Sequence, residues 1–335
     1  MRPAVALVFA VLLAPAAQAQ PTCAAGSALF VYRDLRLFTV GSTTYACLGS
    51  AAAPRNLGRG VKRVAFDGAR HLAAARSGAV RVARDGTVVR NDHGRLTVRR
   101  PDGAAAVLNA TATTELAMTG GTIYWTARRS VHTAKLSGVA QGEENVLFGP
   151  FASANRAGAC TGVTRGIIAA SASIRVFTKR TELGRTRMFC GNGNVSELDG
   201  GADNLRHREV RIVHGRWILL RDVVSGPRAT TGMIRVVDTR SARVVTEVDT
   251  ETGDLGHATL LDNGTLAWIA PGGPLLVQRP NEDDPTELAP PSDSPTALAS
   301  APHTVYWTAG GAPHRAGYKK RRSECCLAPK AALRL

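Results

Sequence analysis

The sequence predicts an all-β fold, a single β-propeller, and three observations support this prediction. A hairpin of an apolar strand, a tight turn and a second apolar strand occurs seven times. Successive turns are roughly 39 to 53 residues apart, which brackets the ~40–50 residues of one four-stranded blade. No segment beyond the first residues keeps a helical period, and the strands alternate apolar and polar residues. We therefore expect seven blades, or six if the first and last hairpins form one composite blade.

The hairpins follow one another along the whole chain and share the same turn chemistry. Asp-Gly and Asn-Gly pairs favour tight turns because these residues accept positive φ at little cost. The clearest copies are 116–126 and 297–308, which share a Tyr-Trp-Thr sequence. Tandem β-sandwiches would also give short strands, but they give no reason for a near-constant period. The turns lie at Gly26, Gly68, Gly121, Gly166, Gly215, Gly264 and His303.

The repeated Tyr-Trp pairs, Tyr124-Trp125 and Tyr306-Trp307, are interpreted as core residues. Large aromatic side chains at matching places in different blades fill the wedge between neighbouring sheets. The alternative is an exposed platform that stacks on sugars. Strand alternation can expose only one ring of each adjacent pair, so we expect core packing.

Residues 1–19 read as a signal peptide, followed by the propeller over 20–318 and a basic tail over 319–335. Arg2 precedes an apolar run, and Ala17-Gln18-Ala19 matches the small-residue cleavage site of exported proteins. The apolar run is shorter than the ~20 residues that span a bilayer. The sequence therefore predicts a secreted or periplasmic protein without a membrane span.

Export predicts disulfides, because they persist in oxidising compartments. We expect two local bridges, Cys23–Cys47 and Cys160–Cys190, each flanking one hairpin region. Six cysteines allow about 15 pairings, so the spacing alone does not decide the pattern. Cys325 and Cys326 are adjacent in the basic tail, and a vicinal bridge, an intermolecular bridge and a free pair all remain open.

The chain is strongly basic, with 42 Lys and Arg against 26 Asp and Glu and a formal net charge of +16. A GC-rich genome would raise the arginine content without any function. The alternative is a surface that concentrates anionic partners. Export excludes intracellular nucleic acid, which leaves a protein or an extracellular polyanion. The candidate binding residues are Arg81, Arg84, Arg90, Arg95, Arg99, Arg100, Arg315, Lys319, Lys320, Arg321 and Arg322.

No linear motif predicts a catalytic centre, a metal site or a cofactor. The sequence contains neither a G-x-S-x-G elbow nor an H-E-x-x-H helix motif, and its histidines are scattered singly. Propeller enzymes assemble their sites from several blades, so this absence weighs little against catalysis.

The stretches 67–74 and 263–268 resemble the hairpins of periplasmic TolB-type and WD40-like propellers. In those propellers a strand, an Asp-Gly turn and an apolar strand recur in each blade, and both stretches match the turn and the apolar strand that follows it. The Gly-His and Trp-Asp signatures of WD40 repeats are missing, so no site residue carries over. The resemblance implies a fold and a binding role.

The sequence therefore predicts an exported, monomeric binding or scaffolding module for a protein or an anionic polymer. The alternative function is an enzyme that acts on a carbohydrate or a small ester at the mouth of the central channel.

Overall fold

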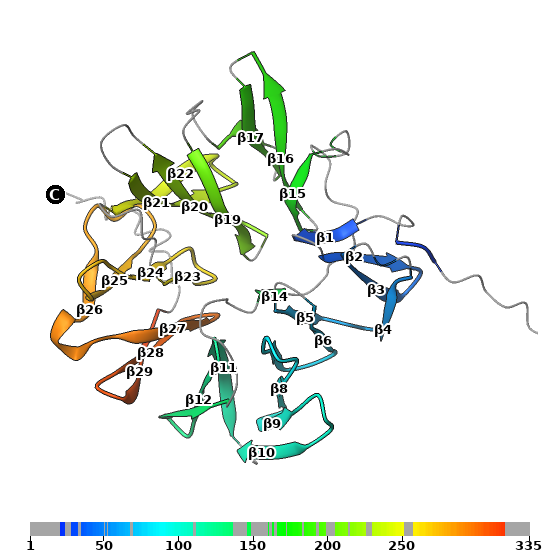
Figure 1. Ribbon diagram of the computed structural model, residues 1–335, viewed down its shortest axis with the longest axis vertical. Helices are drawn as coiled ribbons and strands as arrows, with labels where there is room; N and C mark the ends of the chain where they lie inside the picture. The colour runs from blue at the N-terminus through cyan, green and yellow to red at the C-terminus, as the bar shows by residue number, and fades with distance from the viewer. Residues whose placement is uncertain are drawn as a thin grey trace, which may run out of the picture.

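The computed structural model is a ring of seven β-sheets around a central axis (Figure 1). The structure describes 21–23, 28–32, 35–49, 51, 53–67, 70–109, 112–136, 146–148, 160, 163, 166–171, 173–182, 184–191, 194–198, 205–213, 215–225, 230–250 and 257–318. The predicted signal peptide and the tail 319–335 lie outside these residues. The single β-propeller expected from the hairpin repeat is confirmed.

The first half of the chain supplies fourteen strands to the ring, and the last of them, the short β14, pairs antiparallel with β5. They are β1 (Ala28–Tyr32), β2 (Leu35–Val40), β3 (Thr43–Leu48), β4 (Arg55–Arg59), β5 (Arg63–Phe66), β6 (Leu72–Ala75), β7 (Ala79–Val82), β8 (Val88–Asp92), β9 (Arg95–Arg99), β10 (Ala105–Asn109), β11 (Thr113–Thr119), β12 (Thr122–Ala127), β13 (Ser130–Lys135) and β14 (Val146–Phe148).

The second half supplies the remaining strands and one short 3-10 helix, η2 (Pro291–Asp293). The strands are β15 (Ile167–Ala170), β16 (Ile174–Thr181), β17 (Gly184–Gly191), β18 (Asn194–Glu197), β19 (Leu205–Val213), β20 (Trp217–Ser225), β21 (Thr230–Asp238), β22 (Arg243–Thr250), β23 (Ala258–Leu260), β24 (Leu266–Ile269), β25 (Leu275–Gln278), β26 (Thr286–Ala289), β27 (Thr296–Ala301), β28 (Thr304–Ala309) and β29 (Ala312–Gly317). No helix in the described part of the chain is long and apolar enough to cross a membrane.

The order of the sheets around the ring differs from their order along the chain. The largest sheet has eight strands, because β1 of the β1–β4 unit pairs antiparallel with β15 of the β15–β18 unit. From this junction, β5–β6, β7–β10 and β11–β13 follow in one direction, and β19–β22, β23–β26 and β27–β29 follow in the other (Figure 1). The β11–β13 and β27–β29 sheets then meet and close the ring. The first and last hairpins therefore lie in different sheets.

The two halves of the chain are internal copies of each other. Thr122–Ala127 and Thr304–Ala309 read Thr-Ile-Tyr-Trp-Thr-Ala and Thr-Val-Tyr-Trp-Thr-Ala. In the first copy Trp125 stacks on His132, with ring centroids 5.4 Å apart. In the second copy Trp307 stacks on His314 at 5.5 Å. Equal contacts from equal sequence positions indicate an ancestral duplication rather than a general blade consensus.

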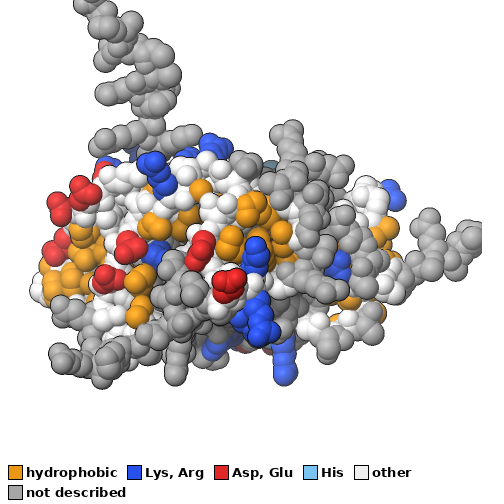
Figure 2. All heavy atoms as spheres, turned by 90° about the horizontal axis from the view of Figure 1, so that it is seen from above, with side chains coloured by type: hydrophobic (Ala, Val, Ile, Leu, Met, Phe, Trp, Pro, Cys, Tyr) orange, Lys and Arg blue, Asp and Glu red, His pale blue; other side chains and the backbone are white. Residues whose placement is uncertain are grey.

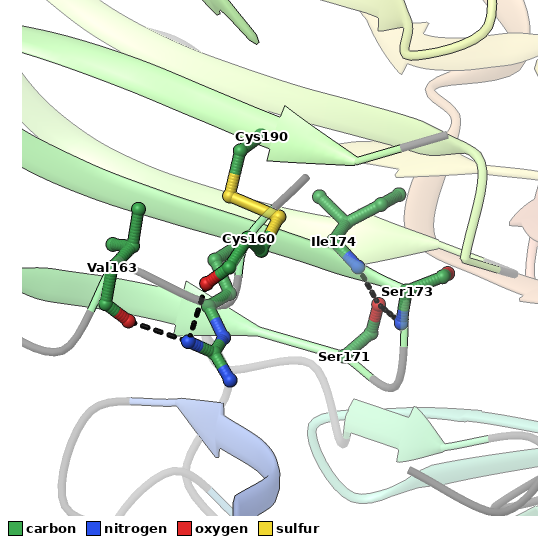
Figure 3. The surroundings of a disulfide bond; sticks show 7 residues. Cys160, Val163, Ser171, Ser173, Ile174 and Cys190 are labelled. Carbon is green, nitrogen blue, oxygen red and sulfur yellow. Dashed lines mark hydrogen bonds between the residues drawn. A yellow bond between two sulfur atoms is a disulfide. The ribbon is translucent and has the colours of Figure 1, made fainter. Parts of the chain in front are cut away.

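The two predicted disulfides are a second pair of equivalent features. Cys23 is bonded to Cys47, and Cys160 is bonded to Cys190. Cys47 lies directly opposite Arg36, and Cys190 directly opposite Arg175. Arg36 donates a hydrogen bond to the carbonyl of Cys23, and Arg175 donates one to the carbonyl of Cys160 at 2.8 Å (Figure 3). The same arrangement, an arginine hydrogen-bonded to a carbonyl of the disulfide, thus lies on each side of the β1–β15 junction.

A third pair of equivalents reveals a hairpin that the sequence reading missed. Gly264 adopts φ +87°, and a Cβ there would lie 2.8 Å from Trp217. Gly86 adopts φ +89°, and a Cβ there would lie 2.9 Å from His71. Gly86 closes the turn between β7 and β8, and Gly264 closes the turn between β23 and β24. Each hairpin supplies the first two strands of a four-stranded sheet, so the two hairpins are equivalent. The described part of the chain therefore contains eight such hairpins, two of which share the eight-stranded sheet.

The apolar core lies between the sheets, where neighbouring blades meet face to face. Tyr124 and Tyr306 are fully buried, and Trp125 and Trp307 are nearly so. The tyrosine rings stack at 5.9 Å between the β11–β13 and β27–β29 sheets. This confirms the interpretation of the Tyr-Trp pairs as core residues. The two tyrosine blades are neighbours in space although far apart along the chain.

We expect loss of the Cys160–Cys190 bridge to lower the free energy of unfolding by about 2–4 kcal/mol, because it closes a long loop in the unfolded chain. The two cysteines are 30 residues apart in the sequence. The double variant Cys160→Ser/Cys190→Ser, unfolded in guanidinium chloride, measures this loss. Adding reductant should destabilise the unaltered chain more than the variant, since only the former still has both bridges to lose. An equal response to reductant would contradict the prediction.

Candidate anion-binding site

The two copies differ most at the second sheet, and a cavity lies at the place of the difference. In the second half, β20 continues into β21 and β22, which cover the outer part of the sheet. In the first half, β6 ends at Ala75 and β7 of the next sheet begins at Ala79. The first copy therefore lacks the equivalents of β21 and β22. The neighbouring sheets β1–β4 and β7–β10 enclose a gap there.

This gap is a cavity of about 260 Å³ with an apolar floor and a basic mouth. Leu57 and Val61, from the end of the first blade, line it together with Ala74 and Ala75 of β6. Arg76, Ser77, Arg90 and Asp92 complete the lining. In the second half, Leu219, Trp268, Ile234 and Val236 pack together in the corresponding region. Small residues and missing strands in the first copy therefore open a space that large side chains fill in the second.

The basic mouth of the cavity continues as an arginine face on β8 and β9. Arg90 lies opposite Thr97, Arg95 opposite Asp92, and Arg99 opposite Val88, so all three arginines project from the same face of the sheet. All three are exposed. Within the described ranges, no hydrogen bond or ion pair of these guanidinium groups is formed. Asp92 lies on the same face, but the three arginines outnumber it, so the face keeps a net positive charge that an anion bound there would neutralise.

The other predicted binding residues are not all brought to this face. Arg81 is buried, and its guanidinium donates to the carbonyls of Val80 and of Ser300 in β27. Burial, and then the charge of Arg63, lower the pKa of Arg81 to about 10, while Asp262 opposes the shift. Arg81 thus joins the two halves inside the ring and is unavailable to a ligand at the outer face.

Arg315 lies at the closing junction of the ring rather than beside the cavity. It donates to Thr126 at 3.1 Å and to the carbonyl of Arg129 at 3.1 Å. Arg84 and Arg100 are exposed at the ends of the β7–β10 strands. The predicted residues Lys319, Lys320, Arg321 and Arg322 lie outside the described residues.

Two basic residues at the cavity were missed by the sequence reading. Arg76 follows β6 directly, and Arg55 of β4 donates to the carbonyl of Leu72 in β6 at 3.3 Å. Each stands alone in the sequence, so neither forms part of a charge run. The sequence signal that could have revealed the cavity is the link of only three residues between β6 and β7, where the other blades continue with one or two more strands.

The equivalent sheet in the second half has the opposite charge. β23–β26 and its loops contain Arg279 as their only Lys or Arg in 257–294, against a run of acids. In Figure 2 the acidic side chains gather toward the end of the molecule at which β25 and β26 lie in Figure 1. The acids of this segment are Asp262, Glu282, Asp283, Asp284, Glu287 and Asp293.

No three His, Cys, Asp or Glu side chains in the described part of the chain are grouped so that they could hold a metal ion. The acidic loop before β26 is held in place by contacts of Glu282 with its neighbours in the sequence. Glu282 pairs with Arg279 at 3.4 Å, and its carbonyl accepts a hydrogen bond from Gln278.

Several solved propeller structures are similar to this chain at low sequence identity. The WD40 propeller domain of Doa1 is 9% identical, with 90% of this chain and 96% of that chain covered and a TM-score of 0.28. Hsv2 from Kluyveromyces lactis is 11% identical, with coverage of 83% and 88% and a TM-score of 0.26. TolB from Acinetobacter baumannii is 13% identical, with coverage of 75% and 61% and a TM-score of 0.24. No family model and no curated protein sequence matches the chain. The propeller assignment rests on the sheets described above.

Proposed function

We propose that this protein is an exported binding module whose arginine face on β8 and β9 holds an anionic partner, either a protein or a polymer. The observation that carries the proposal is the opposite charge of two sheets, β7–β10 and β23–β26, that occupy equivalent places in the two halves of the chain. A GC-rich genome would raise the arginine content of both copies alike. The basic sheet is thus better explained by a local requirement for positive charge than by codon usage.

The geometry supports the same function. Arg90, Arg95 and Arg99 project together from one face and have no partner in the described part of the chain. Their guanidinium groups can each donate two parallel hydrogen bonds to a carboxylate, sulfate or phosphate. The two disulfides are typical of proteins from oxidising compartments, which fits an extracellular or periplasmic partner.

The test is binding of the full chain to dextran sulfate and to poly-L-glutamate, with neutral dextran as the uncharged probe. We expect the triple variant Arg90→Ser/Arg95→Ser/Arg99→Ser to weaken binding by about tenfold or more, and to reduce its dependence on salt between about 50 and 200 mM. The unaltered chain should bind both anionic polymers and should not bind dextran.

The matched control is Arg180→Ser/Arg185→Ser/Arg243→Ser, which removes the same charge from exposed positions on other blades. This control should bind nearly as well as the unaltered chain. Equal weakening in both triple variants would mean that net charge alone attracts the polymers, and the proposed site would be wrong. Absence of binding to either anionic polymer at low salt would also overturn the proposal.

A further inference from the structure

We propose that the cavity beside β6 binds an extended acidic peptide, which adds to the free edge of β6 as an antiparallel strand. This inference rests on the proposed function and narrows its partner to a polypeptide segment. It starts from the strands that the first copy lacks. β20 pairs with β19 on one side and β21 on the other, whereas β6 pairs only with β5 in the described residues.

The direction of the backbone groups on β6 shows which of them face the cavity. The amide of Asp67 donates to the carbonyl of His71, so His71, Ala73 and Ala75 direct their backbone groups toward β5. Leu72 and Ala74 therefore direct theirs outward. The carbonyl of Leu72 already accepts a hydrogen bond from Arg55, a side chain that stands where a strand would donate. A strand added to this edge would share the carbonyl of Leu72 with Arg55 or displace that guanidinium, and it would pair with the outward backbone groups of Ala74.

The two walls of the cavity predict the side chains of the peptide. Leu72 and Ala74 lie on the face of β6 that packs against Leu57 and the first blade. Ala73 and Ala75 lie on the opposite face, toward β7 and β8. Directly opposite residues of an antiparallel pair point to the same face. A strand added to β6 would therefore alternate its side chains between an apolar wall and an arginine wall.

Charge and size favour a polypeptide as the occupant. The apolar wall formed by Leu57 and Val61 gives no contact to a uniformly charged polymer, but it suits every second side chain of a peptide. Arg90, which comes from the opposite wall, suits the intervening acidic side chains, and Arg76 lies beside Gly58 of β4 at the edge of the apolar wall. We infer an alternating acidic–apolar sequence, in which the apolar residues lie opposite Leu72 and Ala74 and form the backbone hydrogen bonds.

The test uses a peptide of alternating glutamate and valine and two N-methylated versions of it. An antiparallel strand uses the N–H of every second residue toward its neighbour, and here these are the valines. N-methylation of the valines should weaken binding by about tenfold or more, whereas N-methylation of the glutamates should change it little. A peptide of the same composition with all glutamates in one block should also bind weakly.

On the protein, Ala74→Leu introduces the residue that the second copy has at this place, Leu220, and should narrow the cavity. The variant should bind the alternating peptide about tenfold more weakly than the unaltered chain. Its binding of dextran sulfate should not change, because the arginine face remains intact. The far-ultraviolet circular dichroism of the variant should match that of the unaltered chain.

The outcomes separate this inference from the function on which it rests. One outcome is that both N-methylated peptides bind as well as the unmethylated peptide, while binding of every anionic probe still requires Arg90, Arg95 and Arg99. The arginine face would then bind polyanions, and the proposed strand addition would be wrong. If an anionic polysaccharide binds through these arginines and the peptide does not, the partner class is wrong. If no probe depends on the arginines, the proposed function itself fails.

Discussion

Replacing Asp222 by asparagine is expected to lower the free energy of unfolding by about 3–5 kcal/mol, as for other buried ion pairs that lose one partner. Asp222 is fully buried on β20 and accepts hydrogen bonds from Arg187 at 2.7 Å and Arg235 at 2.9 Å. Arg187 is itself fully buried. The substitution keeps the shape of the side chain but leaves two buried cations without their shared counter-charge. Guanidinium chloride unfolding followed by tryptophan fluorescence measures the loss.

Asp238→Asn provides the matched control, because Asp238 lies in the same sheet and accepts two hydrogen bonds of similar length from one arginine. Arg216 donates to its two oxygens at 3.0 and 2.6 Å. The Arg216 side chain is 31% exposed, however, so water can replace the lost charge. We expect a loss of about 1 kcal/mol there. Equal losses in the two variants would show that burial does not set the energy of the Asp222 cluster.

The hairpin repeat was readable from the sequence, because its turn glycines and apolar strands are local signals. The ring order was not readable, since it depends on which sheets pack together over long distances. The shared Tyr-Trp-Thr sequence at 124–126 and 306–308 was seen as two blades of a regular series. The structure shows that these are equivalent ends of two duplicated halves. The hairpin at Gly86 was missed because it follows the preceding turn by about half the usual blade length.

The candidate site was only partly predictable for a related reason. Strand alternation predicted that several arginines of this segment share one face, but it could not show that Arg81 turns inward toward Ser300. The inward orientation of Arg81 depends on the position of β27, the strand that contains Ser300. The cavity itself arises from strands that are absent, and a missing element leaves no pattern in the residues that remain. Comparing the two halves of one chain would have exposed it.

The junction that closes the ring should carry a large share of its stability, and its two tyrosines provide the test. Tyr306 donates to Glu115 at 2.6 Å and lies 2.8 Å from the hydroxyl of Thr126. Tyr124 donates to the carbonyl of Ala297 at 3.0 Å. Burial, followed by the hydrogen bond to Glu115, raises the pKa of Tyr306, so its hydroxyl stays protonated near neutral pH. No disulfide of the described residues crosses this junction, so packing, these hydrogen bonds and those of Arg315 hold the β11–β13 and β27–β29 sheets together here.

Truncation of either tyrosine to alanine should therefore cost about 3–5 kcal/mol, as for other large buried aromatic side chains. The two losses should not add, because the rings stack on each other and the first truncation already removes that contact. We expect the double variant to lose about 0.5–1.5 kcal/mol less than the sum of the single losses. Equilibrium unfolding of the four proteins in the double-mutant cycle measures this coupling. Additive losses would mean that each tyrosine is bound only within its own half, and that the ring is held closed by contacts elsewhere.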